Sequence, residues 1–313
     1  MTDAPEPHPV GMHQLGPRVV GQRVVVRYLL PDGRATDVLG TCVSWGAEEL
    51  VVHRDGGEPV SIRLADVVTG KPVPLRPSVR HRVAAHDVEL HVASLWPAMT
   101  TQPLGTWLLR ASPPLGGRLR RRGNSALAMA EPDVSLSAAT SAVRSFYADL
   151  GQDPLIQVQA DSPLELALAP LGFTPLGDGD AHCQLAPVSR ALRSCNRRLQ
   201  ELNGRPSGRS VGLDAGYIED GHRLTVEHGD ESVVARGEAA LDGDWLGLHD
   251  LEVDPSHRRQ GLATRVLAEL LDWGAAQGAT TAWLHVETDN DAGLATYGRL
   301  GFVTHHTNRY LRG

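Results

Sequence analysis

The chain has 313 residues, 41% of them hydrophobic, and a formal net charge of −7. The length predicts two or three domains, and the composition excludes a disordered chain. No apolar run reaches the roughly 18–20 residues that cross a bilayer, and the acidic balance argues against a nucleic-acid partner.

The first fifteen residues carry three prolines and neither the basic nor the apolar region of a signal peptide. We therefore expect residues 1–15 to form a disordered tail. The three cysteines, Cys42, Cys183 and Cys195, are odd in number and widely spaced, which fits neither a disulfide framework nor a zinc site. We expect a cytoplasmic location and no metal.

Residues 16–76 are predicted to form a small closed β-barrel, because they hold short β signals without helical periodicity. The expected turns are Pro31–Gly33 and Asp55–Gly57, where glycine supplies a positive φ. Lys71–Pro77 reads as a linker. The expected strands are Arg23–Tyr28, Asp37–Trp45, Glu49–His53 and Pro59–Leu64.

Residues 78–187 alternate helical and strand patterns. The predicted helices are 78–97, 135–150 and 163–171, and the predicted strands are 105–110, 125–130, 155–158 and 181–187. A helix over 189–202 and a linker over 203–214 are expected to fill the region 188–214 before the last domain, residues 215–313.

The last domain repeats this order. The predicted strands are 246–253, 282–286 and 304–311, and the predicted helices are 261–276 and 292–300. The triplets Leu171–Phe173 and Leu300–Phe302 both read Leu-Gly-Phe and lie 129 positions apart. A single repeat of this period indicates a duplicated domain and not a solenoid.

The most informative segment runs from Leu248 to Thr264. A strand ends at Val253, and Arg258 to Ala263 then spell Arg-x-x-Gly-x-Ala directly before an amphipathic helix. The first N–H groups of a helix lack intrahelical partners, and Gly261 permits close approach of a ligand. The pattern therefore predicts a phosphate or pyrophosphate site, although it is neither a Walker loop nor a dinucleotide fingerprint.

This turn, followed by Asn290, Tyr297 and Gly301-Phe302, resembles the GNAT superfamily of acetyl-CoA-dependent N-acetyltransferases over residues 232–313. The whole chain resembles actinobacterial members that carry an SH3-like N-terminal barrel. The shared motifs are Trp107–Arg110, Arg122–Ser125, Phe146-Tyr147 and His305-His306.

The resemblance implies an α+β fold, with mixed sheets flanked by helices, and it implies that acetyl-CoA is the acyl donor. It implies that the backbone of 251–253 holds the pantetheine arm and polarises the thioester, and that Tyr297 protonates the leaving thiolate. The implied cofactor-binding residues are Leu251, Glu252, Val253, Arg258, Arg259, Gln260, Gly261, Leu262, Ala263, Thr264, Asn290 and Tyr297.

The general base is left open. The positions where the family often has glutamate are occupied by His249 and His285, with Asp250 and Glu252 nearby. An imidazole of pKa ~6.5 accepts a proton from an ammonium through water. Glu287 is shifted by two residues from the usual position.

The first copy, residues 78–187, departs from the pattern. Glu131–Ser135 stand where the pyrophosphate loop is expected, without arginine or glycine, and the counterpart of Asn290 is Asp161 or Ser162. We expect this half to have lost cofactor binding. We expect Arg118–Arg122 to form a solvated loop, with anion binding as the alternative, and His305 and His306 to point to opposite faces of the last strand.

The sequence thus predicts transfer of an acetyl group from acetyl-CoA to a primary amine of a small molecule or peptide. The attack is direct, because no cysteine lies in the motif region. The alternative is a non-catalytic acyl-CoA sensor whose barrel recruits a protein or nucleic acid. A homodimer is compatible with either function, and no membrane partner is expected.

Overall fold

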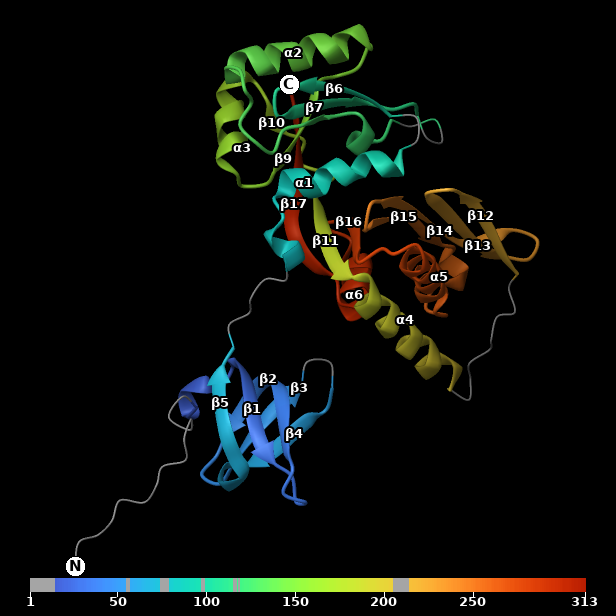
Figure 1. Cartoon of the computed structure of the whole chain (residues 1–313). Helices are drawn as coiled ribbons and strands as arrows, with labels where there is room; N and C mark the ends of the chain where they lie inside the picture. Colours follow the sequence, from blue (N-terminus) through green and yellow to red (C-terminus); the bar gives the residue numbers. More distant parts are fainter. Residues whose placement is uncertain are drawn as a thin grey trace, which may run out of the picture. The chain divides into compact units, whose positions relative to one another are not determined.

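The computed structural model (Figure 1) describes residues 15–54, 57–73, 79–96, 99–114, 117, 119–204 and 214–313. The chain divides into two compact units, residues 1–78 and 79–313. The expected tail, the turn at 55–57 and both linkers fall wholly or largely outside the described residues. The first linker begins later than expected, because Lys71 and Pro72 end a paired strand, Val67–Pro72. Among the residues described, no helix has the length and apolar character needed to cross a membrane.

The N-terminal unit is a five-stranded antiparallel sheet with the strand order β4-β3-β2-β1-β5, as a small barrel-like domain requires. Alternate side chains of the strands, such as Val24 and Val26, point into one apolar core. The strands are β1 (Arg23–Leu29), β2 (Ala35–Trp45), β3 (Glu49–Arg54), β4 (Pro59–Arg63) and β5 (Val67–Pro72).

The C-terminal unit is built on a mixed sheet with helices packed against it (Figure 1). Its strands are β6 (Thr100–Leu104), β7 (Trp107–Ala111), β8 (Ala126–Leu127), β9 (Leu155–Gln159), β10 (Thr174–Pro175), β11 (Ala181–Pro187), β12 (Ala215–Asp220), β13 (Arg223–Gly229), β14 (Val233–Asp242), β15 (Trp245–Val253), β16 (Thr281–Glu287) and β17 (Val303–Arg312). Its α-helices are α1 (Ala85–Leu90), α2 (Leu136–Asp149), α3 (Pro163–Leu168), α4 (Val188–Asn203), α5 (Leu262–Ala276) and α6 (Asp291–Leu300).

The two copies of the repeat exchange their last strands. Each copy has a parallel strand pair, β8 with β9 and β15 with β16. However, β11 of the first copy pairs with β16 of the second, and β17 of the second pairs with β9 of the first. Figure 1 shows β17 leaving the region of α6 and carrying the C-terminus toward α2. One continuous sheet therefore joins both copies, and residues of each copy lie beside residues of the other.

Most predicted elements of this unit are confirmed to within one or two residues, including the helices that became α2, α4, α5 and α6. The single helix expected at 78–97 is wrong, because only α1 is α-helical and the flanking residues form tighter 3-10 turns. The strand expected at 125–130 is also too long, since β8 pairs with β9 only at Ala126 and Leu127. The strands β6, β10, β12, β13 and β14 were not expected.

Candidate active site

The strands β15 and β16 separate part of the way along their length. They pair in parallel from Trp245 and Thr281 as far as Leu248 and Leu284. Beyond Leu248, β14 is the only strand among the described residues that pairs with β15. The register of this pairing shifts between Arg236 and Glu238. Asp250 lies in this irregular stretch with φ of 50°. The backbone of residues 251–253 therefore has no strand beside it on the β16 side.

A cavity of about 1490 Å³ opens along this separated part of β15. It continues past the turn after β15 to the first residues of α5, with α4 and α6 on its other side. Its lining includes Leu251, Glu252, Val253, Arg258, Arg259, Gly261, Leu262, Ala263, Thr264, Asn290 and Tyr297. Of the residues that the sequence implicates in cofactor binding, Gln260 alone does not line the cavity, and its side-chain amide donates to the Ser256 carbonyl at 3.4 Å.

The turn before α5 is shaped by two positive φ angles, 61° at Arg259 and 88° at Gly261. Among the described residues, no side chain caps the start of α5. A Cβ atom on Gly261 would lie 2.6 Å from Cδ1 of Leu202, so a larger residue would require this side chain to move as well as a strained backbone. The first N–H groups of the helix lack intrahelical acceptors and lie in the cavity wall, which makes this end of the cavity an anion cradle.

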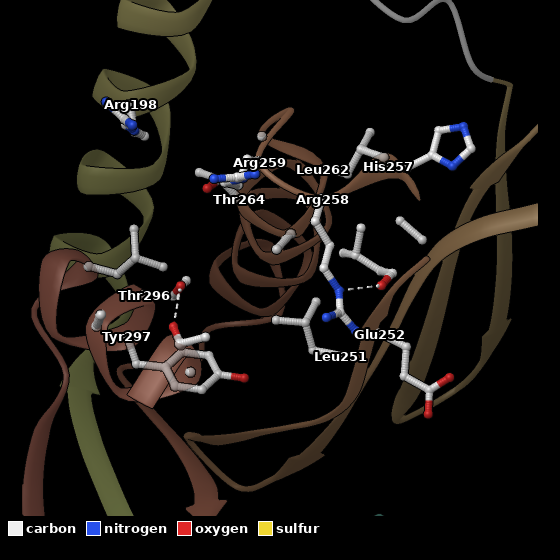
Figure 2. A pocket seen from close by; sticks show the side chains of 18 of the residues that line it. Arg198, Leu251, Glu252, His257, Arg258, Arg259, Leu262, Thr264, Thr296 and Tyr297 are labelled. Atoms are coloured by element: carbon white, nitrogen blue, oxygen red, sulfur yellow. Dashed lines mark hydrogen bonds between the residues drawn. The ribbon is translucent and has the colours of Figure 1, made fainter. Parts of the chain in front are cut away.

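Arginines from several elements line the same cavity. Sequence analysis identified Arg258 and Arg259 but missed Arg197 and Arg198, whose helix, α4, precedes the second copy. Figure 2 shows Arg198 on α4 at the end of the cavity where Arg259 and Thr264 lie. The remaining arginines of the lining are Arg236 and Arg299. This concentration of positive charge suits a ligand with several phosphates.

A second, smaller cavity of about 250 Å³ lies next to the first. Both cavities are lined by Leu251, Glu252, Asn290 and Tyr297, so the two meet at these residues. All five predicted catalytic residues line the small cavity: His249, Asp250, Glu252, His285 and Tyr297. Glu287 and Arg122 line it as well.

Tyr297 lies at the boundary between the two cavities. Figure 2 shows its ring pointing across the large cavity toward the strand that carries Leu251. Burial raises the pKa of its hydroxyl to about 12. The phenol therefore keeps its proton throughout the physiological pH range, although it is a weaker acid than an exposed tyrosine.

His249 and His285 both have lowered pKa values. Burial is the main cause of the lowered pKa of His249. The carboxylate of Glu238, which lies 3.5 Å from Nε2, acts in the opposite direction and raises this pKa. Burial is also the main cause for His285, opposed by Glu89, whose Oε1 lies 2.7 Å from Nε2. Both imidazoles are therefore neutral at pH 7 and able to accept a proton.

Two predictions about neighbouring residues need correction. Arg122 does not belong to a wholly solvated loop, since it lines the small cavity, whereas Arg121 pairs with Asp178 and Arg118 lies outside the described residues. His305 and His306 do not point to opposite faces, because their Nδ1 atoms lie 2.7 Å apart. The register between β11 and β17 shifts at this point, and this irregularity breaks the alternation.

The first copy has no comparable cradle among the residues that the structure describes. Ser135 stands at the start of α2, and its hydroxyl accepts the N–H of Ala138 at 3.2 Å. Ser162 caps α3 in the same way that Asn290 caps α6, where the Asn290 side chain accepts the N–H of Gly293 at 2.9 Å. The starts of α2 and α3 in the first copy are thus closed by their own side chains.

Comparisons with known proteins agree with this architecture. Residues 211–311 match a family described as probable histone acetyltransferase Rv0428c C-terminal, and residues 18–71 match the Rv0428c N-terminal Sm-like domain. The chain is 29% identical to the probable histone acetyltransferase Rv0428c of Mycobacterium tuberculosis, covering 93% of this chain and 95% of that protein. It is 27% identical to the uncharacterized N-acetyltransferase YobR of Bacillus subtilis, covering 72% and 98%. A GCN5-related N-acetyltransferase from Kribbella flavida shares the fold, with a TM-score of 0.53 at 18% identity over 74% of this chain and 95% of that one.

Proposed function

The chain belongs to the GNAT superfamily of N-acetyltransferases, and from this premise we propose that it transfers an acetyl group from acetyl-CoA to a primary amine. The observation that carries the proposal is the meeting of the two cavities at Leu251 and Tyr297. The large cavity is the donor site and the small cavity is the acceptor site. The acetyl group would be held where they join.

The large cavity suits acetyl-CoA in shape and in charge. The uncapped start of α5 and the glycine at position 261 form a cradle for the pyrophosphate. Arg197, Arg259 and Arg299 make no ion pair with any residue that the structure describes, so they remain available to the phosphates. The backbone edge of 251–253 has no strand partner on the β16 side and is available to the amides of the pantetheine arm, with the Val253 carbonyl accepting from Nε of Arg258 at 3.3 Å.

The small cavity suits the ammonium form of an amine. Carboxylates of Asp250, Glu252 and Glu287 line it and attract a positive charge. Its volume of about 250 Å³ admits a small amine or the end of one peptide side chain.

Acetyl-CoA supplies an acetyl group activated as a thioester. An imidazole of the small cavity, that of His249 or His285, takes one proton from the acceptor ammonium, which leaves a neutral nucleophilic amine. A backbone N–H of residues 251–253 stabilises the negative charge that develops on the carbonyl oxygen. Tyr297 gives its proton to the departing sulfur and regains one from the nitrogen that becomes the amide. One proton is released overall.

The first test is calorimetric titration with acetyl-CoA. We expect micromolar binding by the wild type and a loss of at least about tenfold, or 1.4 kcal/mol, in Arg259→Glu. Arg54→Glu is the matched control, because Arg54 is an exposed arginine of the N-terminal unit. If the wild type does not bind acetyl-CoA, the proposed donor is wrong.

The acceptor is then sought by following CoA release with a panel of small and peptide amines. An enzyme is favoured over a sensor without turnover, since the relatives carry acetyltransferase names.

We also propose a cytoplasmic location and an SH3-like barrel at the N-terminus. The three free cysteines support the cytoplasmic location, and the five-stranded sheet supports the barrel.

A further inference from the structure

Glu89 on α1 belongs to the first copy and is only 1% exposed. Its carboxylate accepts four hydrogen bonds, and such complete pairing is what makes a buried charge tolerable. The donors are Nε2 of His285 at 2.7 Å, Nε2 of His306 at 3.0 Å, Nδ2 of Asn308 at 2.9 Å and Nε2 of Gln157 at 2.8 Å. Burial alone would raise the pKa of Glu89, but the two imidazoles outweigh it and hold the pKa well below its usual range.

The positive charge that balances the Glu89 carboxylate follows from the hydrogen bonds of His305 and His306. Nε2 of His305 lies 2.9 Å from the Val83 carbonyl, and the two Nδ1 atoms share the bond between the rings. Together with the bond to Glu89, three hydrogen bonds require three ring protons, because a carbonyl and a carboxylate only accept. Two neutral imidazoles carry two protons, so one ring is an imidazolium. The balancing positive charge therefore lies on the His305–His306 pair, and Nε2 of His306 contacts Glu89 at 3.0 Å.

These bonds also fix the proton on His285. Because Glu89 is ionised, its 2.7 Å contact with Nε2 of His285 needs a proton on Nε2, and the neutral ring carries its proton there. Nδ2 of Asn308 also lies 3.0 Å from this nitrogen, but it donates to Oε1 of Glu89 at 2.9 Å. Nδ1 of His285 makes no hydrogen bond with the residues that the structure describes, and the ring lines the small cavity. The unprotonated nitrogen of His285 is therefore Nδ1.

We propose that Glu89 is a positioning residue for acetyl transfer, which holds His285 as the general base with Nδ1 as the atom that receives the proton. The inference rests on the proposed function and selects one of its two candidate bases. An N–H bond of the acceptor ammonium breaks, its electron pair stays on the amine nitrogen, and the proton moves to Nδ1. Glu89 then stabilises the imidazolium until the proton passes to solvent, as the carboxylate of a Ser-His-Asp triad does for its histidine.

This role gives the first copy a purpose although it has no cofactor cradle among its described residues. Gln157 on β9 holds the second oxygen of Glu89 and itself accepts from Arg110 on β7 at 2.6 Å. His306 and Asn308 come from β17, which lies beside β9 only because the copies exchange strands. The exchange thus assembles a carboxylate of one copy with a base of the other.

Several other titratable groups interact with this pair: Arg110, His305 and Tyr310 through the charge of Glu89, and Arg122, His306 and Cys183 more directly. Arg122 and His306 lower the pKa of His285, acting with burial and against Glu89. Burial and the Glu89 charge raise the pKa of the Cys183 thiol well above its usual value. Ligand atoms of Glu89, Cys183 and His306 lie within 4.8 Å of one another, but Oε1 of Glu89 already accepts three hydrogen bonds. We therefore interpret Glu89, Cys183 and His306 as a hydrogen-bonded cluster and not as a metal site.

The test is long-range proton–nitrogen NMR of the full chain with nitrogen-15 histidine, in which His285→Gln assigns the His285 signals. We expect wild-type His285 at pH 7.5 to be a single tautomer with its proton on Nε2. In Glu89→Gln the tautomer preference is lost, and the ring titrates about one pH unit lower or more, because the opposite charge is gone. Glu165→Gln removes a partly buried carboxylate of the same copy, one paired with Arg309 at 2.9 Å, and leaves His285 unchanged.

A His285 proton on Nδ1 in the wild type overturns the proposal even if Glu89→Gln does not fold. An unchanged His285 titration in a folded Glu89→Gln also overturns it, and so does a stoichiometric metal ion in the purified protein. These readouts do not depend on acetyl-CoA. Failure of the wild type to bind acetyl-CoA would remove the proposed function and leave the tautomer result standing.

Discussion

Ser135 and Gly261 hold the same position in the two copies, at the start of the helix that follows the first strand of the parallel pair. Ser135 caps its helix with its own hydroxyl, whereas Gly261 leaves the N–H groups of α5 without a side-chain acceptor. An uncapped helix start in a cavity wall needs a ligand or water to satisfy its donors. The difference between the two residues separates a helix start that its own side chain closes from one that is open to an anion.

Hydrogen–deuterium exchange checks this difference directly. We expect acetyl-CoA to slow exchange of the amides of 251–253 and 262–264, because both segments would donate to the bound ligand. The corresponding segment of the first copy, residues 136–138, should not change, since Ser135 already caps this helix start. Equal protection of both segments would contradict the assignment of the first copy as a half without a cofactor.

Replacement of Tyr297 by phenylalanine separates catalysis from binding. The ring packs near Phe302, with 5.9 Å between the ring centres, and phenylalanine preserves this contact. We expect kcat to fall by about 10²–10⁴-fold, the usual contribution of a general acid, while the affinity for acetyl-CoA stays within about twofold. The measurements are CoA release and calorimetry. An unchanged kcat would remove Tyr297 from the mechanism.

Substitution of Gly261 by alanine should affect both stability and binding. Its φ of 88° costs a residue with a side chain about 1–2 kcal/mol, and the new Cβ would press on Leu202. Gly278 is a matched control, because its φ is 89° and a Cβ atom there would have no neighbour within 4 Å. We expect thermal unfolding to show a loss in both variants, larger in Gly261→Ala, and calorimetry to show weaker acetyl-CoA binding in Gly261→Ala alone.

The residues of the proposed donor site could be predicted from the sequence because its parts are local. The turn from Arg258 to Ala263 lies between a strand and a helix that are contiguous in the chain, and all but one of its implicated residues line the cavity. Arg197 and Arg198 were missed because they precede the second copy, on a helix that reaches the cavity only through the packing of α4 against α5.

Glu89 could not be recognised from the sequence. It stands between Val88 and Leu90 in a segment whose apolar spacing indicates a helix but says nothing about a buried carboxylate. Its partner His285 is 196 positions away and meets it through pairing of strands from different copies. The pair His305-His306 was noticed as a motif, but the irregular register that brings the two rings together depends on β11. Such long-range pairings leave no periodic signal in the chain.

The dependence of kcat on pH tests which imidazole is the base. The base must be unprotonated, and the pKa of both His249 and His285 lies below 6.5. We therefore expect kcat to be constant from about pH 7 upward and to fall as the pH drops through the lowered pKa. Tyr297, with its pKa of about 12, should add no decline on the alkaline side below about pH 10.

Single variants identify the residue whose titration causes the acid limb, which is the fall of kcat at low pH. His285→Gln should lower kcat and abolish the limb, because the residue that titrates is gone. His249→Gln should retain the limb, since the Glu89–His285 pair is intact, and should move it only slightly. The opposite pattern would make His249 the base, with Glu238 as its partner at 3.5 Å. The profile is measured with saturating acetyl-CoA and the best amine of the panel, so that the pKa refers to the bound enzyme.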